Sequence, residues 1–259
     1  MTAVIRHILF DLDGTLLPMD QEEFVRYYMP MLAEAYISRG IPVEPGPFID
    51  AVWKGYQAMV ENDGSCTNEE AFWNYTAGTI PVERAEAVRI AEEFYGGEFN
   101  RAASVCRPAE AAARIVKTAM DQGTEVYLAT NPVFPRCATM NRIRWAGLRP
   151  EDFRIITTYE DCRYCKPNVR YFQEILEKFG LAPEECLMVG NDVEEDLAVR
   201  SLGVSAFLVT DCLENKKQLP IETEYMGTLQ ECLEFISAMP SGGRETAGSG
   251  SCREGDGIR

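Results

Sequence analysis

The chain contains little histidine and little positive charge. Its 259 residues include one histidine, His7, and 25 lysines and arginines against 41 aspartates and glutamates, a formal net charge of -16. Because His7 lies inside an apolar stretch that is typical of a strand, we expect a structural role for it, and nucleophilic mechanisms that depend on histidine are excluded. The excess negative charge repels polyanions at long range, so we expect neither nucleic acid nor an anionic membrane as a partner.

Long apolar runs and secretory features are also missing. No run approaches the roughly 20 apolar residues of a membrane span, and the first ten residues lack the length and cleavage site of a signal peptide, so we expect a cytoplasmic protein. The nine cysteines are an odd number spread along a long chain, which favours free thiols over a disulfide framework. Cys162 and Cys165 have the spacing of a redox or zinc pair, but no second pair or nearby histidine completes a zinc site.

The apolar residues that are present follow a helical spacing from residue 18 to about residue 102. Apolar residues make up 46% of the whole chain, enough for a substantial core. Within this helical segment the breaks fall at glycines and prolines, and aromatic residues are frequent, which we expect to form the core of a small bundle. The sequence predicts four helices here, at residues 22–39, 47–62, 68–79 and 82–95.

After residue 108 the helical and strand patterns alternate. This alternation, with the apolar run before Asp11 as a first strand, predicts an α/β fold: a Rossmann-like, doubly wound parallel sheet with helices on both faces. The last residues, 240–259, contain hardly any apolar side chain and are predicted to be a disordered tail. The predicted helices are 109–122, 135–146, 168–179, 194–202 and 228–238, and the predicted later strands are 125–130, 153–157, 185–189 and 205–209.

Two aspartates, Asp11 and Asp13, stand directly after the first predicted strand and before a glycine turn at Gly14. In open α/β sheets, ligands bind at the carboxyl ends of the strands. A carboxylate at this place can attack phosphorus and form an aspartyl-phosphate, while a neighbouring carboxyl group carries the proton of the leaving group. We therefore assign Asp11 as the candidate nucleophile and Asp13 as the candidate acid/base.

The stretch Asp11–Leu16, with the sequence DLDGTL, resembles the first motif of the haloacid dehalogenase-like hydrolases. Two later positions resemble the second and third motifs of that family. Thr130, followed by Asn131, stands after an apolar strand, where a hydroxyl and backbone N–H groups can hold a phosphoryl oxygen. Lys166 precedes a proline at the start of a predicted helix, where its charge can neutralise the attacking carboxylate and the phosphate oxygens. The predicted substrate-binding residues are Thr130, Asn131 and Lys166.

The fourth motif departs from the family pattern at one position. The family often has aspartate directly after the glycine of this motif, where this chain has Asn191. We expect Asp192 to act as the metal ligand instead, with Asp196 as a ligand or support, while the neutral oxygen of Asn191 remains an alternative. Glu194 and Glu195 are predicted to be exposed acids of a first helical turn. Four clustered carboxylates repel one another unless a hard cation, most simply Mg²⁺, neutralises them. The predicted metal ligands are Asp11, Asp13, Asp192 and Asp196.

The resemblance implies a capped, Mg²⁺-dependent phosphatase that acts on a small phosphorylated metabolite. Residues 1–17 and 103–239 would form the core domain, and the helical segment 18–102 would be an inserted cap that closes over the site. In the implied reaction Asp11 attacks phosphorus, and Asp13 protonates the leaving alcohol and then activates water. The charge on the phosphoryl oxygens would be stabilised by Thr130, Lys166 and Mg²⁺.

Several alternatives stay open on the sequence alone. Dehalogenases of the superfamily normally lack the second acid, so Asp13 argues against that activity. Phosphomutases and other phosphotransferases of the same fold, and phosphonatases, keep it, and a phosphonatase would need a Schiff-base lysine, for which Lys54 is the one lysine in the helical segment. A non-enzymatic phosphate-binding regulatory module of the receiver type would be about half this length. The sequence indicates neither the particular phosphate ester nor the oligomeric state.

Overall fold

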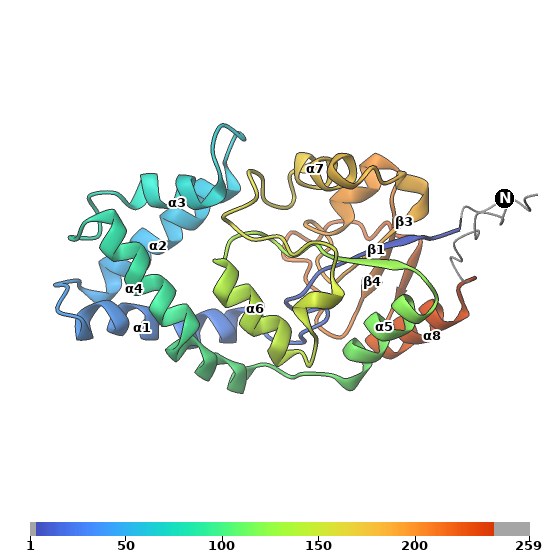
Figure 1. The fold of residues 1–259 in the computed structure, drawn as a ribbon, viewed down its shortest axis with the longest axis horizontal. Coiled ribbons are helices and arrows are strands. Elements are labelled where there is room, and N and C mark those ends of the chain that lie inside the picture. Colours follow the sequence, from blue (N-terminus) through green and yellow to red (C-terminus); the bar gives the residue numbers. More distant parts are fainter. Residues whose placement is uncertain (1–3, 241–259) are drawn as a thin grey trace, which may run out of the picture.

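The computed structural model describes residues 4–240 and contains a five-stranded, all-parallel sheet in the order β2-β1-β3-β4-β5 (Figure 1). β1 lies between β2 and β3, so the residues that follow β1 stand near the middle of the carboxyl edge. The predicted α/β class with a parallel sheet is confirmed. The strands are β1 (His7–Phe10), β2 (Glu125–Leu128), β3 (Cys186–Gly190), β4 (Ser205–Val209) and β5 (Tyr225–Gly227).

Alternate residues of β1 enter different hydrophobic clusters. Ile8 and Phe10 pack on the side of α5 and α8, whereas Leu9 packs on the side of α7 and the 3-10 helix η4. Because a strand directs successive side chains to opposite faces, a strand covered on both faces is apolar at every position. The elements around the sheet are α5 (Glu110–Asp121), α6 (Arg136–Trp145), η2 (Pro150–Asp152), α7 (Val169–Phe179), η3 (Pro183–Glu185), η4 (Leu197–Leu202) and α8 (Leu229–Ala238).

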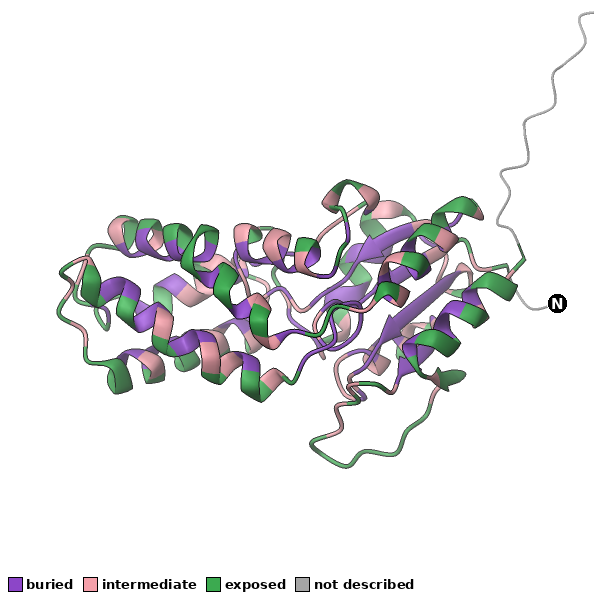
Figure 2. Cartoon of the chain, turned by 90° about the horizontal axis from the view of Figure 1, so that it is seen from below, coloured by how far each residue is buried: buried purple, intermediate pink, exposed green. Residues whose placement is uncertain are grey.

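The four helices predicted between β1 and α5 are present and lie together at one end of the molecule (Figure 1). Their buried residues face the interior and their outer faces are exposed (Figure 2). The side chain of Asp20 caps α1, and Thr67 with Glu70 forms a capping box at the start of α3. No helix within residues 4–240 is both long enough and apolar enough to cross a bilayer. These elements are α1 (Gln21–Ser38), α2 (Pro45–Val60), α3 (Asn68–Thr76), α4 (Arg84–Gly96) and the 3-10 helix η1 (Glu98–Val105).

Two predicted elements form differently. Residues 153–157 are not a strand, since a single bridge joins Ile156 to the last residue of β2. Residues 194–196 are turns, and the helix that follows them, η4, is of the 3-10 type. The carboxylate of Asp192 accepts hydrogen bonds from the first N–H groups of this stretch. Such side-chain contacts compete with regular helix formation.

One strand escaped prediction, and one prediction falls outside the described residues. β5 is a three-residue edge strand that pairs with β4 and carries the exposed side chains of Tyr225 and Met226. Its length gives no period-two pattern to detect. The predicted disordered tail, 240–259, lies beyond the described part of the chain except for its first residue.

The surroundings of His7 indicate a structural role. His7 opens β1 at the end opposite to Asp11, with its Nδ1 atom 3.5 Å from a carboxylate oxygen of Glu125.

The eight cysteines within residues 4–240 are free thiols, as expected. Burial raises the pKa of Cys162 to about 12 and that of Cys165 well above its ordinary value. Neither thiol is therefore ionised at neutral pH, which argues against a redox role.

Candidate active site

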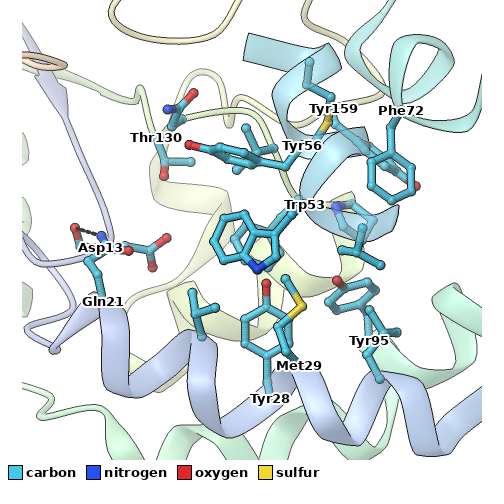
Figure 3. A pocket seen from close by; sticks show the side chains of 18 of the residues that line it. Asp13, Gln21, Tyr28, Met29, Trp53, Tyr56, Phe72, Tyr95, Thr130 and Tyr159 are labelled. Atoms are coloured by element: carbon cyan, nitrogen blue, oxygen red, sulfur yellow. Dashed lines mark hydrogen bonds between the residues drawn. The ribbon is translucent and has the colours of Figure 1, made fainter. Parts of the chain in front are cut away.

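Three strands bring the predicted site residues to one edge of the sheet. Asp11 directly follows β1, Thr130 is the second residue after β2, and the loop 191–196 follows β3. Parallel strands end at the same edge, and a cavity of about 500 Å³ lies there, between the sheet and helices α1–α4 (Figure 3). Six of the predicted site residues line this cavity: Asp11, Asp13, Thr130, Asn131, Asp192 and Asp196.

Lys166, the seventh, is fully buried and bridges two carboxylates. Its Nζ atom lies 2.9 Å from Oδ1 of Asp11 and 2.6 Å from Oδ1 of Asp196. Burial disfavours the lysine charge, but Asp11 and Asp196 outweigh that effect, so the pKa of Lys166 stands well above its ordinary value. The site therefore contains a fixed positive charge directly beside the candidate nucleophile.

Asp11 is held firmly at one of its oxygens. Oδ1 accepts the hydrogen bond from Lys166, whereas Oδ2 lies 3.2 Å from the hydroxyl of Thr15, which is nearer, at 2.8 Å, to the amide oxygen of Asn191. Burial raises the pKa of Asp11 to about 7, while the charge of Lys166 opposes this shift. These contacts fix the carboxylate at the cavity wall, which is the preorganisation that a nucleophile requires.

Asn191 is used for structural contacts. Its amide nitrogen donates to the backbone oxygen of Cys212 at 2.6 Å, and its amide oxygen lies 2.8 Å from the Thr15 hydroxyl. Gly14, at a φ of +84°, packs so closely on this amide that a side chain there would collide with it. Because both amide atoms are engaged, the contacts favour the neighbouring Asp192 over Asn191 as a group that a ligand can reach.

Asp192 and Asp196 are linked to each other. Oδ1 of Asp192 accepts the N–H groups of Glu194 and Glu195, each at 2.8 Å, and its own N–H donates to Oδ2 of Asp196 at 3.0 Å. Burial raises the pKa of Asp192, partly offset by the backbone donors. With Lys166 on Oδ1, Asp196 has a partner at each oxygen, so it holds the lysine and the loop in place.

The comparison with known families decides between the possible classes of protein. Residues 5–203 match the family model of the haloacid dehalogenase-like hydrolases. The chain belongs to this family. The resemblance inferred from the four motifs is thereby confirmed, and the alternative of a receiver-type regulatory module loses its support.

Relatives of this hydrolase cover most of its length. The glyceraldehyde 3-phosphate phosphatase of Methanothermobacter thermautotrophicus is 23% identical over 221 residues, which span 85% of this chain and 92% of that protein. The pyrophosphatase PpaX of Halalkalibacterium halodurans is 28% identical over 205 residues, 79% of this chain and 83% of that protein. The magnesium-bound crystal structure of the HAD-hydrolase YfnB from Bacillus subtilis shares the fold, with a TM-score of 0.57, 18% identity and coverage of 90% of this chain and 99% of that one.

The sequence did not single out Arg142 of this hydrolase, a completely buried side chain on α6. Its guanidinium forms an ion pair with Oδ2 of Asp13, donates to Thr139 at 3.1 Å and stacks 4.1 Å from the ring centre of Phe134. Its spacing was the available sign of burial. Arg142 lies three residues after the buried Thr139 and four after the buried Ala138, on the same face of α6. A buried arginine therefore holds the candidate acid/base, as a buried lysine holds the candidate nucleophile.

Replacing Arg142 with methionine should lower the free energy of unfolding by about 3 kcal/mol, because Asp13 would keep a largely buried carboxylate without its counter-charge. Urea denaturation followed by circular dichroism measures this change. The matched control is Arg136→Met on the same helix, since Arg136 pairs with Asp161 at the exposed surface and should contribute much less. Equal effects of the two substitutions would contradict the importance of the buried pair.

The prediction made for Glu195 is wrong. It was expected to be an exposed acid, but it is half-buried, lines the cavity and accepts a hydrogen bond from Asn131 at 3.0 Å. Burial raises the pKa of Glu195 to about 8, against the opposing charge of Lys166. Asn131 also accepts the N–H of Lys166 at 3.2 Å. Asn131 thus ties the loops after β2 and β3 to the lysine, and its side chain forms these hydrogen bonds rather than one with Asp11.

Beyond the carboxylates the cavity continues between the helices of the 18–102 segment. There its walls are mostly aromatic and aliphatic (Figure 3). Lys54, the lysine that a phosphonatase would need, is exposed on α2 and does not line the cavity. A lysine that does line the cavity, Lys216, lies in the segment after β4 and outside the helical segment in which the Schiff-base residue was expected.

Proposed function

We propose that this hydrolase is a Mg²⁺-dependent phosphatase that cleaves small phosphate monoesters through an aspartyl-phosphate at Asp11. The observation that carries the proposal is the pairing of Asp11 with the buried cation of Lys166, beside Asp13, at the wall of a cavity large enough for an organic phosphate. Two curated relatives whose names are those of phosphatases support the same class of reaction.

In the proposed reaction Asp11 attacks phosphorus, so that an Asp–O–P bond forms while the ester P–O bond breaks. Asp13 gives its proton to the leaving alcohol and then takes a proton from the water that attacks the aspartyl-phosphate. Lys166 stabilises negative charge on the phosphoryl oxygens, to which the hydroxyl of Thr130 donates. Asn131 acts in this scheme by positioning the loop that carries Lys166.

The carboxylate oxygens at the cavity are suitable ligands for a hard divalent cation. Oδ1 of Asp13 is buried and has no hydrogen-bond partner within residues 4–240, and the carboxylates of Asp11 and Asp192 line the same cavity. We propose Asp11 and Asp192 as ligands of Mg²⁺. Asp13 was also predicted as a ligand, but Arg142 occupies its Oδ2, so we assign its free Oδ1 to the proton that the reaction needs. Asp196, whose two oxygens already have partners, has a positioning role. Within the described residues no three acidic, histidine or cysteine side chains already surround one point. Mg²⁺ commonly binds through one or two carboxylates and completes its shell with water and substrate phosphate.

When bound, Mg²⁺ would neutralise the carboxylate cluster and polarise the phosphoryl oxygens. The magnesium-bound relative of the same fold is consistent with this cofactor. We also propose that helices α1–α4, within the boundaries 18–102 expected from the sequence, act as a cap, because they supply the wall of the cavity that faces the carboxylates. Closure of such a segment excludes water and selects the substrate.

Mg²⁺ removal tests the proposal directly. Phosphate release from a panel of alkyl, sugar, glycerol and aryl phosphates should fall to background after treatment with EDTA and return when excess Mg²⁺ is added, since the charge of four clustered acids then loses its neutralising ion. Release that is equally fast in EDTA would overturn the metal assignment. No release from any ester, with Mg²⁺ present, would overturn phosphatase activity on small esters.

A further inference from the structure

The part of the cavity that lies within helices α1–α4 is not needed to hold a phosphate. We propose that it binds the organic group of the substrate, and that this group is apolar, carries an aromatic ring and has no second charged group. This inference rests on the proposed phosphatase function and names the substrate class that the same site would take.

The walls of this region, here called the apolar arm, come from all four helices. α1 contributes Tyr28 and Met29, α2 contributes Trp53 and Tyr56, and other walls include Phe72 of α3 and Tyr95 of α4 (Figure 3). Aromatic rings bind other rings by offset or edge-to-face contacts and remove large apolar areas from water. A triose or other small polar phosphate would leave most of this surface without a partner.

Charge is absent from the interior of the apolar arm. Among the cavity-lining residues of α1–α4, the charged side chains are Glu22 and Arg26, and both are exposed residues in the first turns of α1. Two cations, Arg26 and Lys216, line the exposed part of the cavity outside this interior. A second phosphate or a carboxylate placed deep in the arm would have no cation beside it, which is costly in a dry environment. A second charged group is therefore a poor occupant of the interior of the arm.

Three tyrosines add a small polar component. The hydroxyls of Tyr28 and Tyr95 point into the cavity, and that of Tyr56 points toward Thr130 (Figure 3). By contrast, the hydroxyl of Tyr36 is taken by the backbone oxygen of Ala87 at 2.6 Å. Burial raises the pKa values of Tyr28, Tyr56 and Tyr95, so each stays a neutral donor. Apolar walls with a few placed polar groups are typical of sites for mainly apolar ligands.

Trp53 is the residue of the arm that is easiest to test. It lines the cavity, packs edge-to-face on Tyr56 with ring centres 5.6 Å apart, and is still 43% exposed. Because Trp53 is only partly buried, its removal should leave the fold intact.

The test compares two esters with the same type of leaving group, propyl phosphate and 3-phenylpropyl phosphate, in the presence of Mg²⁺. Both release a primary alcohol, so a difference reports binding of the ring and not leaving-group reactivity. We expect kcat/KM to be about 30-fold higher for the phenylpropyl ester, the amount expected for burying one aromatic ring. Trp53→Ala should lower kcat/KM for the phenylpropyl ester about 10-fold more than for the propyl ester. The control Tyr75→Ala changes an exposed aromatic residue of α3 outside the cavity lining and should change neither.

The outcomes separate the inference from the proposed function. Equal kcat/KM for the two esters, or faster cleavage of glycerol phosphate than of both, would overturn the substrate class while leaving phosphatase activity standing. If no ester is cleaved, the phosphatase proposal fails, and calorimetry with the phosphonates of the same two groups still decides the inference. Tighter binding of 3-phenylpropylphosphonate than of propylphosphonate, weakened by Trp53→Ala, supports it, and equal binding overturns it.

Discussion

Replacing Asp11 with asparagine will reduce phosphate release by about 10⁴-fold or more, the range seen when a catalytic nucleophile is removed. Asparagine has nearly the same shape and keeps a hydrogen-bond acceptor beside Lys166, but an amide does not attack phosphorus to give the acyl phosphate. Initial rates on the best ester of the panel, at saturating Mg²⁺, measure the loss. Mass spectrometry of acid-quenched enzyme should show a phosphorylated Asp11 in the wild type and none in the variant.

A matched control separates chemistry from folding in that experiment. Asp121→Asn makes the same chemical change at an exposed site, where Asp121 pairs with Lys117 away from the cavity, and should retain full activity. The Asp11→Asn protein should keep its unfolding midpoint, since Lys166 still has Asp196 as a counter-charge. A variant that retains more than a tenth of the wild-type rate would show that Asp11 is not the nucleophile.

Replacing Lys166 with methionine will lower the free energy of unfolding by about 3–5 kcal/mol, because Asp11 and Asp196 would both remain buried without their cation. It will also abolish phosphate release, since the phosphoryl oxygens lose the same charge. Urea denaturation at neutral pH measures the first effect, with unchanged slope showing that the folded state is still compact.

Two further variants test the origin of that loss. Lys117→Met removes a lysine from an exposed pair with Asp121 and should change stability little. Combining Lys166→Met with Asp196→Asn removes one of the two uncompensated charges, so part of the stability should return without any return of activity. If Lys166→Met and Lys117→Met have the same effect, the buried charge triad does not contribute to stability.

Local pattern was sufficient for the sheet and for the helices around it. Each strand of the sheet apart from β5 is an apolar run that is covered on both faces, and each helix shows its own start and stop signals, such as the capping box of Thr67 and Glu70. Where prediction failed, tertiary contacts or side-chain caps competed with that pattern. The stretch after Asp192 begins as turns for this reason, and β5 exists only because β4 offers an edge to pair with.

The candidate site also contains residues that the sequence predicted and residues that only the structure revealed. Asp11, Asp13, Thr130, Asp192 and Asp196 could be assembled from sequence, since each stands at or just after a strand end, and parallel strands end at one edge. Arg142 and Glu195 could not be assigned to the site from the sequence. Each lies on a segment whose exposed face carries other charged residues, and the sequence does not say which of these charges the fold buries against a carboxylate or a cavity.

The sequence by itself determined the family, the parallel sheet, and the set of carboxylates with their lysine, because these depend on local spacing and on the common edge that strand ends share. Only the tertiary structure decided the partners. It places Lys166 between Asp11 and Asp196, pairs Arg142 with Asp13, and joins Asn191 to Thr15 and to the backbone of Cys212. It also decided that aromatic residues of four separate helices line one apolar arm rather than filling it. The physical reason is that packing distances and burial join residues more than a hundred positions apart, and periodicity along the chain carries no information about them.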